Sequence, residues 1–252
     1  MIDKRYFAIA ILIGTIIGAG FLAIPFVMMK SGAGIGLIHL IIIGILVCTI
    51  MLYLGEIALR TKNPHQLAGY AGKYLGKKGK KIMYVALLFE VYSAVLAYLI
   101  AEGISISHLI FGNVNYAFII SIIFWVILSA FIFKGIKALK EGEFFGNIFF
   151  LSIIAIIVIV FAPDIKISNL ATINLSNAFI PFGVILFAYL AFTSITETVI
   201  ILGNEKRKLK SSIILAFIIA FLVYAIFALV VLGVKGQLTP EIATLSLGKP
   251  FI

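Results

Sequence analysis

The feature that most constrains this chain is an apolar run from Tyr6 to Met29 that carries three glycines and a proline. The run is long enough to cross a bilayer as a helix. The residues that would break it are Gly14, Gly18, Gly20 and Pro25. In lipid, every backbone N–H or C=O group freed by a break needs a partner, so a broken backbone must be buried in protein or line a cavity. The run therefore predicts a broken membrane helix with a binding site at its break.

Further apolar segments follow the first with no insert large enough for a soluble domain. The sequence is 63% hydrophobic and 12% charged, a composition that excludes an ordinary soluble protein. The fold class predicted is all-α, a polytopic membrane protein with about seven transmembrane helices in one domain. The expected helices span residues 6–29, 34–58, 82–110, 115–133, 144–162, 177–202 and 211–234.

The basic residues predict the orientation of these helices. With the N-terminus inside, sixteen of the twenty lysines and arginines fall in inside segments and four in outside segments. This bias favours a cytoplasmic N-terminus in a multi-pass protein of the cell membrane. The net charge of +10 is therefore explained by topology, and no nucleic acid partner is expected.

The residues of the first break resemble a known signature. Gly14-Thr15-Ile16-Ile17-Gly18-Ala19-Gly20, followed by Leu22 and Pro25, is similar to the first helix of amino acid permeases of the amino acid, polyamine and organocation (APC) superfamily. The nearest branch is that of the aromatic and neutral amino acid permeases, which are amino acid/auxin permease-like. The resemblance implies a leucine-transporter-like fold, in which two inverted repeats each contain a broken helix, helices one and six.

The same resemblance divides the chain unevenly. Residues 1–162 would form the first five-helix repeat, and residues 163–252 an incomplete second repeat. Residues 239–252 read like an extracellular loop that leads into an eighth helix. The chain is expected to be either a fragment of a ten- or eleven-helix protein or a shortened relative.

The candidate for helix six runs from Pro181 to Glu197. Relatives commonly have a glycine at its break, and here the corresponding positions hold Ala191, Thr193 and Ser194. A proline often precedes the glutamate, where this chain has Thr196. A second break is therefore expected, with less support from residue type than the first.

The two breaks supply the predicted substrate site. A half-helix that begins after Gly18 would point the N–H groups of Ala19, Gly20 and Phe21 at the carboxylate of an amino acid. By resemblance, the carbonyl of Ile16 and one near Phe187 would receive the substrate ammonium. The side chains expected to line the site are Tyr98, Ala191 and Thr193. The alternative is that the glycines only allow helices to pack closely.

The expected third helix carries the ionisable residues Glu90, Glu102 and His108. A charged group in the hydrocarbon region costs about 2.5–3.5 kcal/mol on insertion scales, so each needs a reason. Glu102 is the preferred proton-coupling candidate and Glu90 the second. The alternative for both is a structural role. The lysine on helix five that some proton-coupled relatives use is absent from residues 144–162, where Asn147 is the strongly polar residue.

The loop at 60–81 is expected to hold a short amphipathic stretch at the membrane surface. Its lysines would bind anionic lipid, and a gating role is the alternative. Glu56 and Glu197 have basic residues nearby and are expected to be solvated or paired.

The predicted function is a secondary active transporter, a symporter of a neutral or aromatic amino acid coupled to protons or sodium. The partners expected are an amino acid substrate, the lipid bilayer and the coupling ion. The alternatives are a truncated fragment or regulatory subunit and, less favoured, a seven-helix receptor. A retinal protein would need a lysine between Ser211 and Val234, and there is none. No enzyme activity, cofactor or metal is predicted, because no nucleophile with a partner, metal-ligand cluster or phosphate loop is found.

Overall fold

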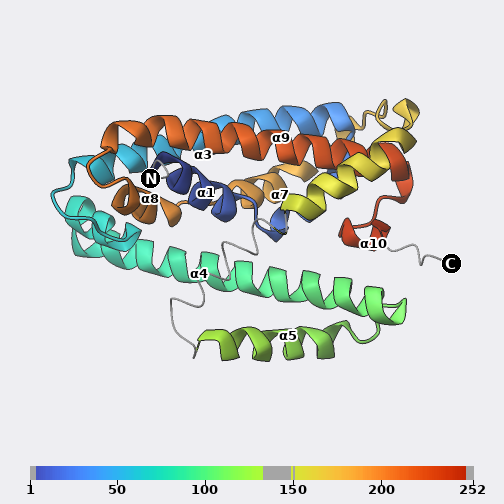
Figure 1. The fold of residues 1–252 in the computed structure, drawn as a ribbon, viewed down its shortest axis with the longest axis horizontal. Coiled ribbons are helices and arrows are strands. Elements are labelled where there is room, and N and C mark those ends of the chain that lie inside the picture. Colours follow the sequence, from blue (N-terminus) through green and yellow to red (C-terminus); the bar gives the residue numbers. More distant parts are fainter. Residues whose placement is uncertain (1–3, 133–148, 150, 248–252) are drawn as a thin grey trace. The chain divides into compact units, whose positions relative to one another are not determined.

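The computed structural model describes residues 4–132, 149 and 151–247, and this part of the chain contains helices and no strand (Figure 1). Within it, four helical stretches are long and apolar enough to cross a membrane, and the number is five if the bent pair near the N-terminus is counted as one span. Two shorter apolar helices, Ala117–Ala130 and Leu151–Asp164, lie on the remaining predicted segments. The all-α, polytopic prediction is confirmed. Asn147 lies outside the described residues.

The helices have the following bounds: α1 Lys4–Ile16, η1 Ala19–Ala23, α2 Ile24–Ser31, α3 Ala33–Arg60, α4 Leu67–Phe111, α5 Ala117–Ile132, α7 Ile180–Tyr189, α8 Ser194–Leu202, α9 Leu209–Lys235 and α10 Thr244–Leu247. The first predicted helix corresponds to α1, η1 and α2, and the sixth corresponds to α7 and α8.

The first membrane helix is broken where its glycines predict. Helix α1 ends at Ile16, and the 3-10 helix η1 begins at Ala19. Between them the Gly18 amide donates to the Ile16 carbonyl at 2.9 Å, a two-residue contact that replaces the usual four-residue helical bond. Pro25 lies in the first turn of α2, where its missing N–H removes no helical hydrogen bond.

The sixth helix is also broken, at the predicted residues. Helix α7 ends at Tyr189 and α8 begins at Ser194. The Leu190 amide donates to the Phe187 carbonyl at 3.2 Å, and the Ser194 amide donates to the Ala191 carbonyl at 3.1 Å. The break therefore forms at Ala191, Thr193 and Ser194, although relatives commonly have a glycine there.

Helix α4 begins earlier than the sequence predicts. It starts at Leu67 and not near residue 82, because a short helix and the long apolar helix follow each other with one non-helical residue between them. That residue is Gly76, at φ 73° and ψ −169°. Buried Leu67, Tyr70 and Ala71 lie on one face of the short helix. The amphipathic stretch predicted for this loop is thus confirmed, and the corner at its end was missed.

The chain divides into two compact units. The first contains Met1–Gly18, His39–Ala94 and Ile185–Val223, and the second contains Ala19–Ile38, Val95–Val184 and Tyr224–Ile252. In the first unit, α1 packs against α8. In the second, the loop before α7 is tied down by backbone bonds from Lys166 to Gly233 (3.0 Å) and from Asn174 to Ser31 (2.9 Å).

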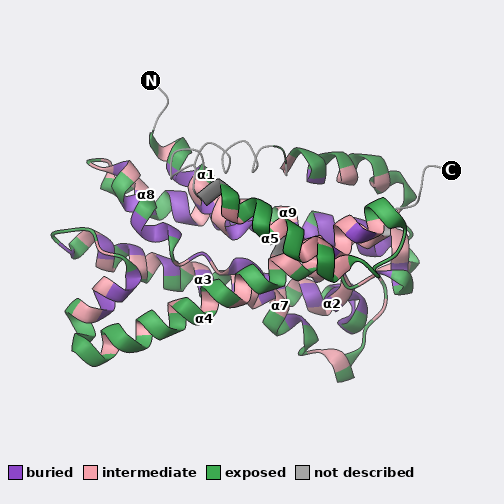
Figure 2. Cartoon of the chain, turned by 90° about the horizontal axis from the view of Figure 1, so that it is seen from below, coloured by how far each residue is buried: buried purple, intermediate pink, exposed green. Residues whose placement is uncertain are grey.

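Burial differs strongly between the spans (Figure 2). Half of the most apolar 18-residue window is buried in Ile180–Leu202 and in Lys206–Leu238, whereas no residue of the corresponding window of Leu67–Phe111 is buried. Many apolar side chains of the long part of α4, from Ile82 onward, are therefore exposed, as expected of a helix surface that lies in an apolar medium.

Candidate substrate site

The first unit holds the carbonyl end of α1. Ile16 and Ile17 are buried, at 1% and 3% exposure, and the Ile16 carbonyl accepts the two-residue contact from the Gly18 amide. The last carbonyls of a helix lack intrahelical donors and carry the negative end of its dipole. This end of α1 is therefore suited to a cationic group.

The break of helix six, in the same unit, has the same character. The carbonyls of Phe187 and Ala191 accept three-residue contacts at the end of α7 and at the break. The Ser194 hydroxyl also donates to the Ala191 carbonyl, at 2.7 Å. Ala191 is 1% exposed, Phe187 is half-buried and Thr193 is exposed. A second helix C-terminus with carbonyl oxygens thus belongs to this unit.

The second unit holds the amide end of the first break. The 3-10 helix Ala19–Ala23 leads directly into α2, and the first amides of a helix carry the positive end of its dipole. The Phe21 side chain is 1% exposed and packs on Tyr224 and Phe227, with ring centroids at 6.0 Å and 4.7 Å. The segment is thereby fixed to α9 at its amide end, which is suited to an anionic group.

The segment after α9 also contacts this amide end. The Ala243 amide donates to the Leu22 carbonyl at 3.0 Å, and Ala243 is fully buried. Beside it, the hydroxyls of Thr244 and Ser105 lie 2.6 Å apart. Residues 239–247 therefore join α4 to η1 within the second unit.

One face of α4 in the second unit carries three of the relevant polar residues. Tyr98, Glu102 and Ser105 are spaced by four and three residues, which places them on one side of a helix. Glu102 and Tyr98 are partly buried. Glu90 belongs to the first unit, and Tyr92, at 71% exposure, is open.

The predicted site residues are therefore divided between the units. Ile16, Gly18, Glu90, Phe187, Ala191 and Thr193 belong to the first, and Ala19, Gly20, Phe21, Tyr98 and Glu102 belong to the second. The carbonyl ends of α1 and α7 belong to the first unit, and the amides of η1 belong to the second unit together with Tyr98 and Glu102. A single peptide bond, between Gly18 and Ala19, joins the two halves of the first break.

An aromatic residue that was not among the predicted site residues lies beside the second break. Tyr189 is fully buried and stacks on Phe217 with ring centroids 5.8 Å apart. A methyl group added to Gly44 would lie 3.2 Å from the Tyr189 ring carbon Cζ and from its hydroxyl oxygen. A glycine in the middle of an apolar helix was the signal that a large side chain packs against it.

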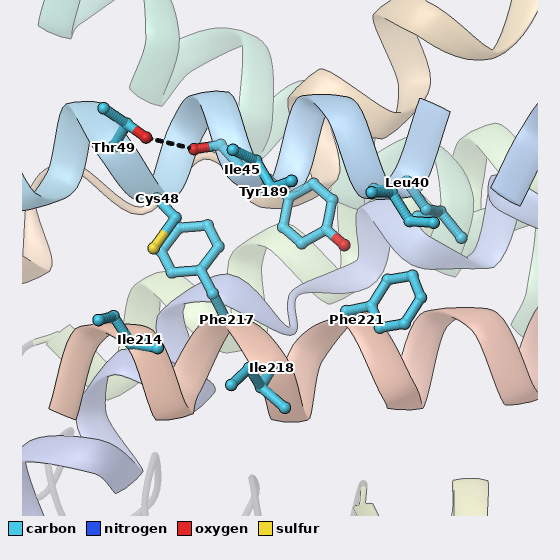
Figure 3. A pocket seen from close by; sticks show the side chains of 11 residues that line it. Leu40, Ile45, Cys48, Thr49, Tyr189, Ile214, Phe217, Ile218 and Phe221 are labelled. Carbon is cyan, nitrogen blue, oxygen red and sulfur yellow. Dashed lines mark hydrogen bonds between the residues drawn. The ribbon is translucent and has the colours of Figure 1, made fainter. Parts of the chain in front are cut away.

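Tyr189 also borders a cavity of about 320 Å³ in the first unit (Figure 3). The cavity lies between α3 and α9 and is lined by apolar side chains, with Cys48 among them. Its walls offer few polar groups, so this cavity does not have the chemistry that an amino acid substrate requires.

The sequence is similar to those of two named transport proteins. Tyrosine-specific transport system 2 of Haemophilus influenzae is 28% identical over 253 residues, which cover 94% of this chain and 60% of that protein. Glutamine transporter 2 of Aliivibrio fischeri is 24% identical over 237 residues, covering 91% of this chain and 61% of that protein. The chain thus spans about three fifths of the length of these two relatives.

The chain also matches the model of a protein family. The model described as the tryptophan/tyrosine permease family matches residues 1–243. The match includes both helix breaks and extends to Ala243, whose amide contacts η1. Because it extends over nearly the whole sequence, the chain belongs to the tryptophan/tyrosine permease family.

Proposed function

We propose that the protein is a secondary active transporter of a neutral or aromatic amino acid, with the leucine-transporter-like fold of the APC superfamily. The observation that carries this proposal is the break of the first membrane helix between Ile16 and Ala19 in a chain of a permease family. An aromatic substrate is favoured because the family is described as that of tryptophan/tyrosine permeases and one of the two relatives is named as a tyrosine-specific system.

The two ends of the substrate would be recognised by the two kinds of helix end. The N–H groups of Ala19, Gly20 and Phe21 bind the carboxylate, and the carbonyls of Ile16 and Phe187 bind the ammonium group. Gly18 allows the backbone to approach the ligand closely. The side chains that line the remaining site are Tyr98, Ala191 and Thr193.

Transport then requires the site to open to each side of the membrane in turn. The N-terminus lies in the cytoplasm, and helices one, two, six and seven move as a bundle against the other helices. The domain division follows from the same proposal, with residues 1–162 as the first repeat and 163–252 as part of the second. Protons are the favoured coupling ion, with Glu102 as the carrier and Glu90 as the second candidate; sodium is the alternative.

The test uses protein purified from its native membrane and reconstituted in liposomes. Uptake and equilibrium binding of labelled tyrosine, tryptophan and glutamine are measured for the wild type and for Gly20→Leu. The leucine side chain would fill the space that a carboxylate needs beside the amides, so binding is expected to be lost while the yield of folded protein stays the same.

The matched control is Gly34→Leu, because a methyl group there would meet no atom within 4 Å. Its binding and uptake are expected to equal those of the wild type. Unchanged affinity in Gly20→Leu would refute the proposed site. Binding without uptake in the wild type would refute transport by this protein and favour a regulatory subunit.

A further inference from the structure

The corner at Gly76 differs from the rest of α4 in its backbone and its charge. The non-helical residue separates the short helix 67–75 from the long helix that follows it. The two stretches contact each other at the corner, since a methyl group on Gly72 would lie 3.1 Å from Cδ of Lys80. Side chains on both sides of Gly76 are thus brought close together.

Five lysines gather at this corner, and all of them are exposed: Lys73, Lys77, Lys78, Lys80 and Lys81. The sequence contains no acidic residue between Glu56 and Glu90. None of the five lysines forms an ion pair with a carboxylate of the described residues. Their positive charge is therefore available to an anionic partner.

A second basic cluster, at residues 206–210, differs because one of its cations is paired with a carboxylate. Glu205 precedes it, and its carboxylate binds the Lys208 ammonium group at 2.7 Å. The two clusters are similar in number of cations, so the corner is distinguished by the absence of neighbouring carboxylates and not by the number of lysines alone.

Apolar side chains stand exposed among the corner lysines. Leu75 and Ile82 are each 71% exposed, and Tyr74 is 53% exposed. Exposed leucine and tyrosine beside lysines are typical of a surface that lies at the boundary between lipid headgroups and acyl chains. The apolar part of α4 begins at Ile82, which keeps the corner next to the membrane and favours lipid over a soluble acidic partner.

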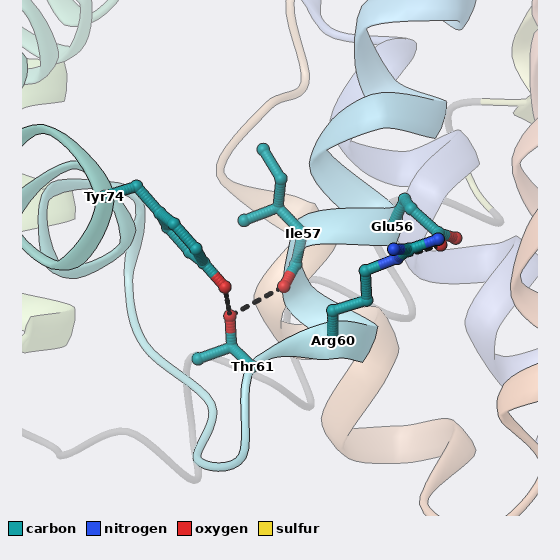
Figure 4. A network of polar contacts seen from close by, with 5 residues as sticks. All are labelled: Glu56, Ile57, Arg60, Thr61 and Tyr74. Atoms are coloured by element: carbon teal, nitrogen blue, oxygen red, sulfur yellow. Dashed lines mark hydrogen bonds and ion pairs between the residues drawn. The ribbon is translucent and has the colours of Figure 1, made fainter.

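The corner is also held in place by hydrogen bonds (Figure 4). The Tyr74 hydroxyl lies 2.8 Å from the Thr61 hydroxyl, which donates to the Ile57 carbonyl at 2.7 Å. On the other side of the loop, the Thr196 hydroxyl donates to the His65 carbonyl at 2.9 Å. A ligand that binds here would therefore meet a preformed surface and would not have to order a loose loop.

We infer that the Gly76 corner is a binding site for the headgroups of anionic phospholipids. The lysine ammonium groups would bind the phosphate oxygens, and Leu75 and Tyr74 would contact the first part of the acyl chains. Each lysine near an anionic surface contributes roughly a fivefold gain in affinity. This inference does not depend on which amino acid is transported.

The test is native mass spectrometry of the whole protein in neutral detergent, titrated with phosphatidylglycerol or phosphatidylcholine. The wild type is expected to retain phosphatidylglycerol much more strongly, and higher salt should weaken that preference alone. The variant Lys77→Gln/Lys78→Gln/Lys80→Gln/Lys81→Gln should lose at least tenfold in phosphatidylglycerol affinity, with phosphatidylcholine binding unchanged.

The matched control changes the other cluster: Lys206→Gln/Arg207→Gln/Lys208→Gln/Lys210→Gln should keep wild-type affinity. Replacing the four corner lysines by arginine should also keep it, which tests the charge even if the glutamine variant folds poorly. Equal losses in both glutamine variants, or a wild type without preference for phosphatidylglycerol, would overturn the inference. Competition by glycerol phosphate or by an RNA oligonucleotide at similar concentration would overturn the assignment to lipid.

Discussion

Glu102 and Glu90 lie on the same helix and have different neighbours. Glu102 shares a face of α4 with Tyr98 and Ser105, and Ser105 contacts Thr244 in the segment that binds η1. Glu90 lies in the first unit, near the exposed side chains of Phe89 and Tyr92. A carboxyl group in the membrane requires a compensating role, and only Glu102 adjoins the residues proposed to bind substrate.

The residue-scale prediction concerns proton coupling. Glu102→Gln keeps the size of the side chain and removes its titration, so it should abolish accumulation driven by a pH gradient while exchange of internal for external substrate continues. Both are measured as uptake of labelled tyrosine into proteoliposomes. Glu90→Gln is the matched control and should accumulate substrate like the wild type.

Retained pH-driven accumulation in Glu102→Gln would show that another group carries the proton or that another ion drives transport. Loss of exchange together with accumulation would instead indicate damage to the substrate site.

At the scale of the elements, Gly76 shows how one backbone angle shapes a helix. Its φ of 73° and ψ of −169° lie in a region that is essentially reserved for glycine. A methyl group on Gly76 would meet no atom within 4 Å. Glycine is therefore required here by the backbone angles and not by a lack of space for a side chain.

This gives a prediction about stability. Gly76→Ala should lower the free energy of unfolding by about 1–3 kcal/mol, because alanine disfavours the required backbone angles. Gly183→Ala, inside α7 and equally free of steric contacts, should raise it by about 0.5–1 kcal/mol, because alanine favours the helix. Denaturant titration in detergent micelles measures both.

If Gly76→Ala and Gly183→Ala changed the free energy of unfolding in the same direction, the effect at Gly76 could not be assigned to its backbone conformation. A repacked corner, seen as altered protease sensitivity of residues 60–81 in Gly76→Ala only, would support it.

The elements also show which parts of the fold the sequence can predict. Apolar length predicted about seven spans, of which four, or five with the bent pair, are long and apolar enough among the described residues. The glycines around Gly18 identified the first break, because their effect on the backbone is local. The corner at Gly76 was missed, since a glycine does not reveal the sign of its φ angle. The packing of Tyr189 on Phe217 and the contact of Thr244 with Ser105 were missed because they join residues far apart in sequence.

The substrate site was predicted only in part for a related reason. The first break follows from residue type, but the second break and the choice of Tyr98, Phe187 and Thr193 relied on resemblance. The structure adds a chemical grouping within each unit, with carbonyl ends near Ile16 and Phe187 in one and the amides after Gly18 in the other.

At the scale of the whole molecule, transport requires segments to separate and rejoin. In the second unit, residues 239–247 contact η1 through Leu22 and α4 through Ser105. If the proposed cycle opens the site on this side, at least one of these contacts must break in each turnover.

A cross-link provides the test. In a Cys48→Ala background, Ser105→Cys with Thr244→Cys places two thiols where hydroxyls lie 2.6 Å apart, so a disulfide is expected to form on oxidation. Oxidation should stop tyrosine uptake, and dithiothreitol should restore it. Each single cysteine variant is the control, and its tyrosine uptake should be unchanged by oxidation. Full uptake by the cross-linked protein would exclude movement of α10 from α4 during transport.

Cys48 is the single cysteine of the chain, and it lines the cavity beside Tyr189 between α3 and α9 (Figure 3). This sequence therefore offers one thiol as an attachment point for a spectroscopic label. A spin label or fluorophore at this position would lie close to the break between α7 and α8. The signal of such a label can thus follow changes near the break of the sixth helix while substrate and ion gradients are applied.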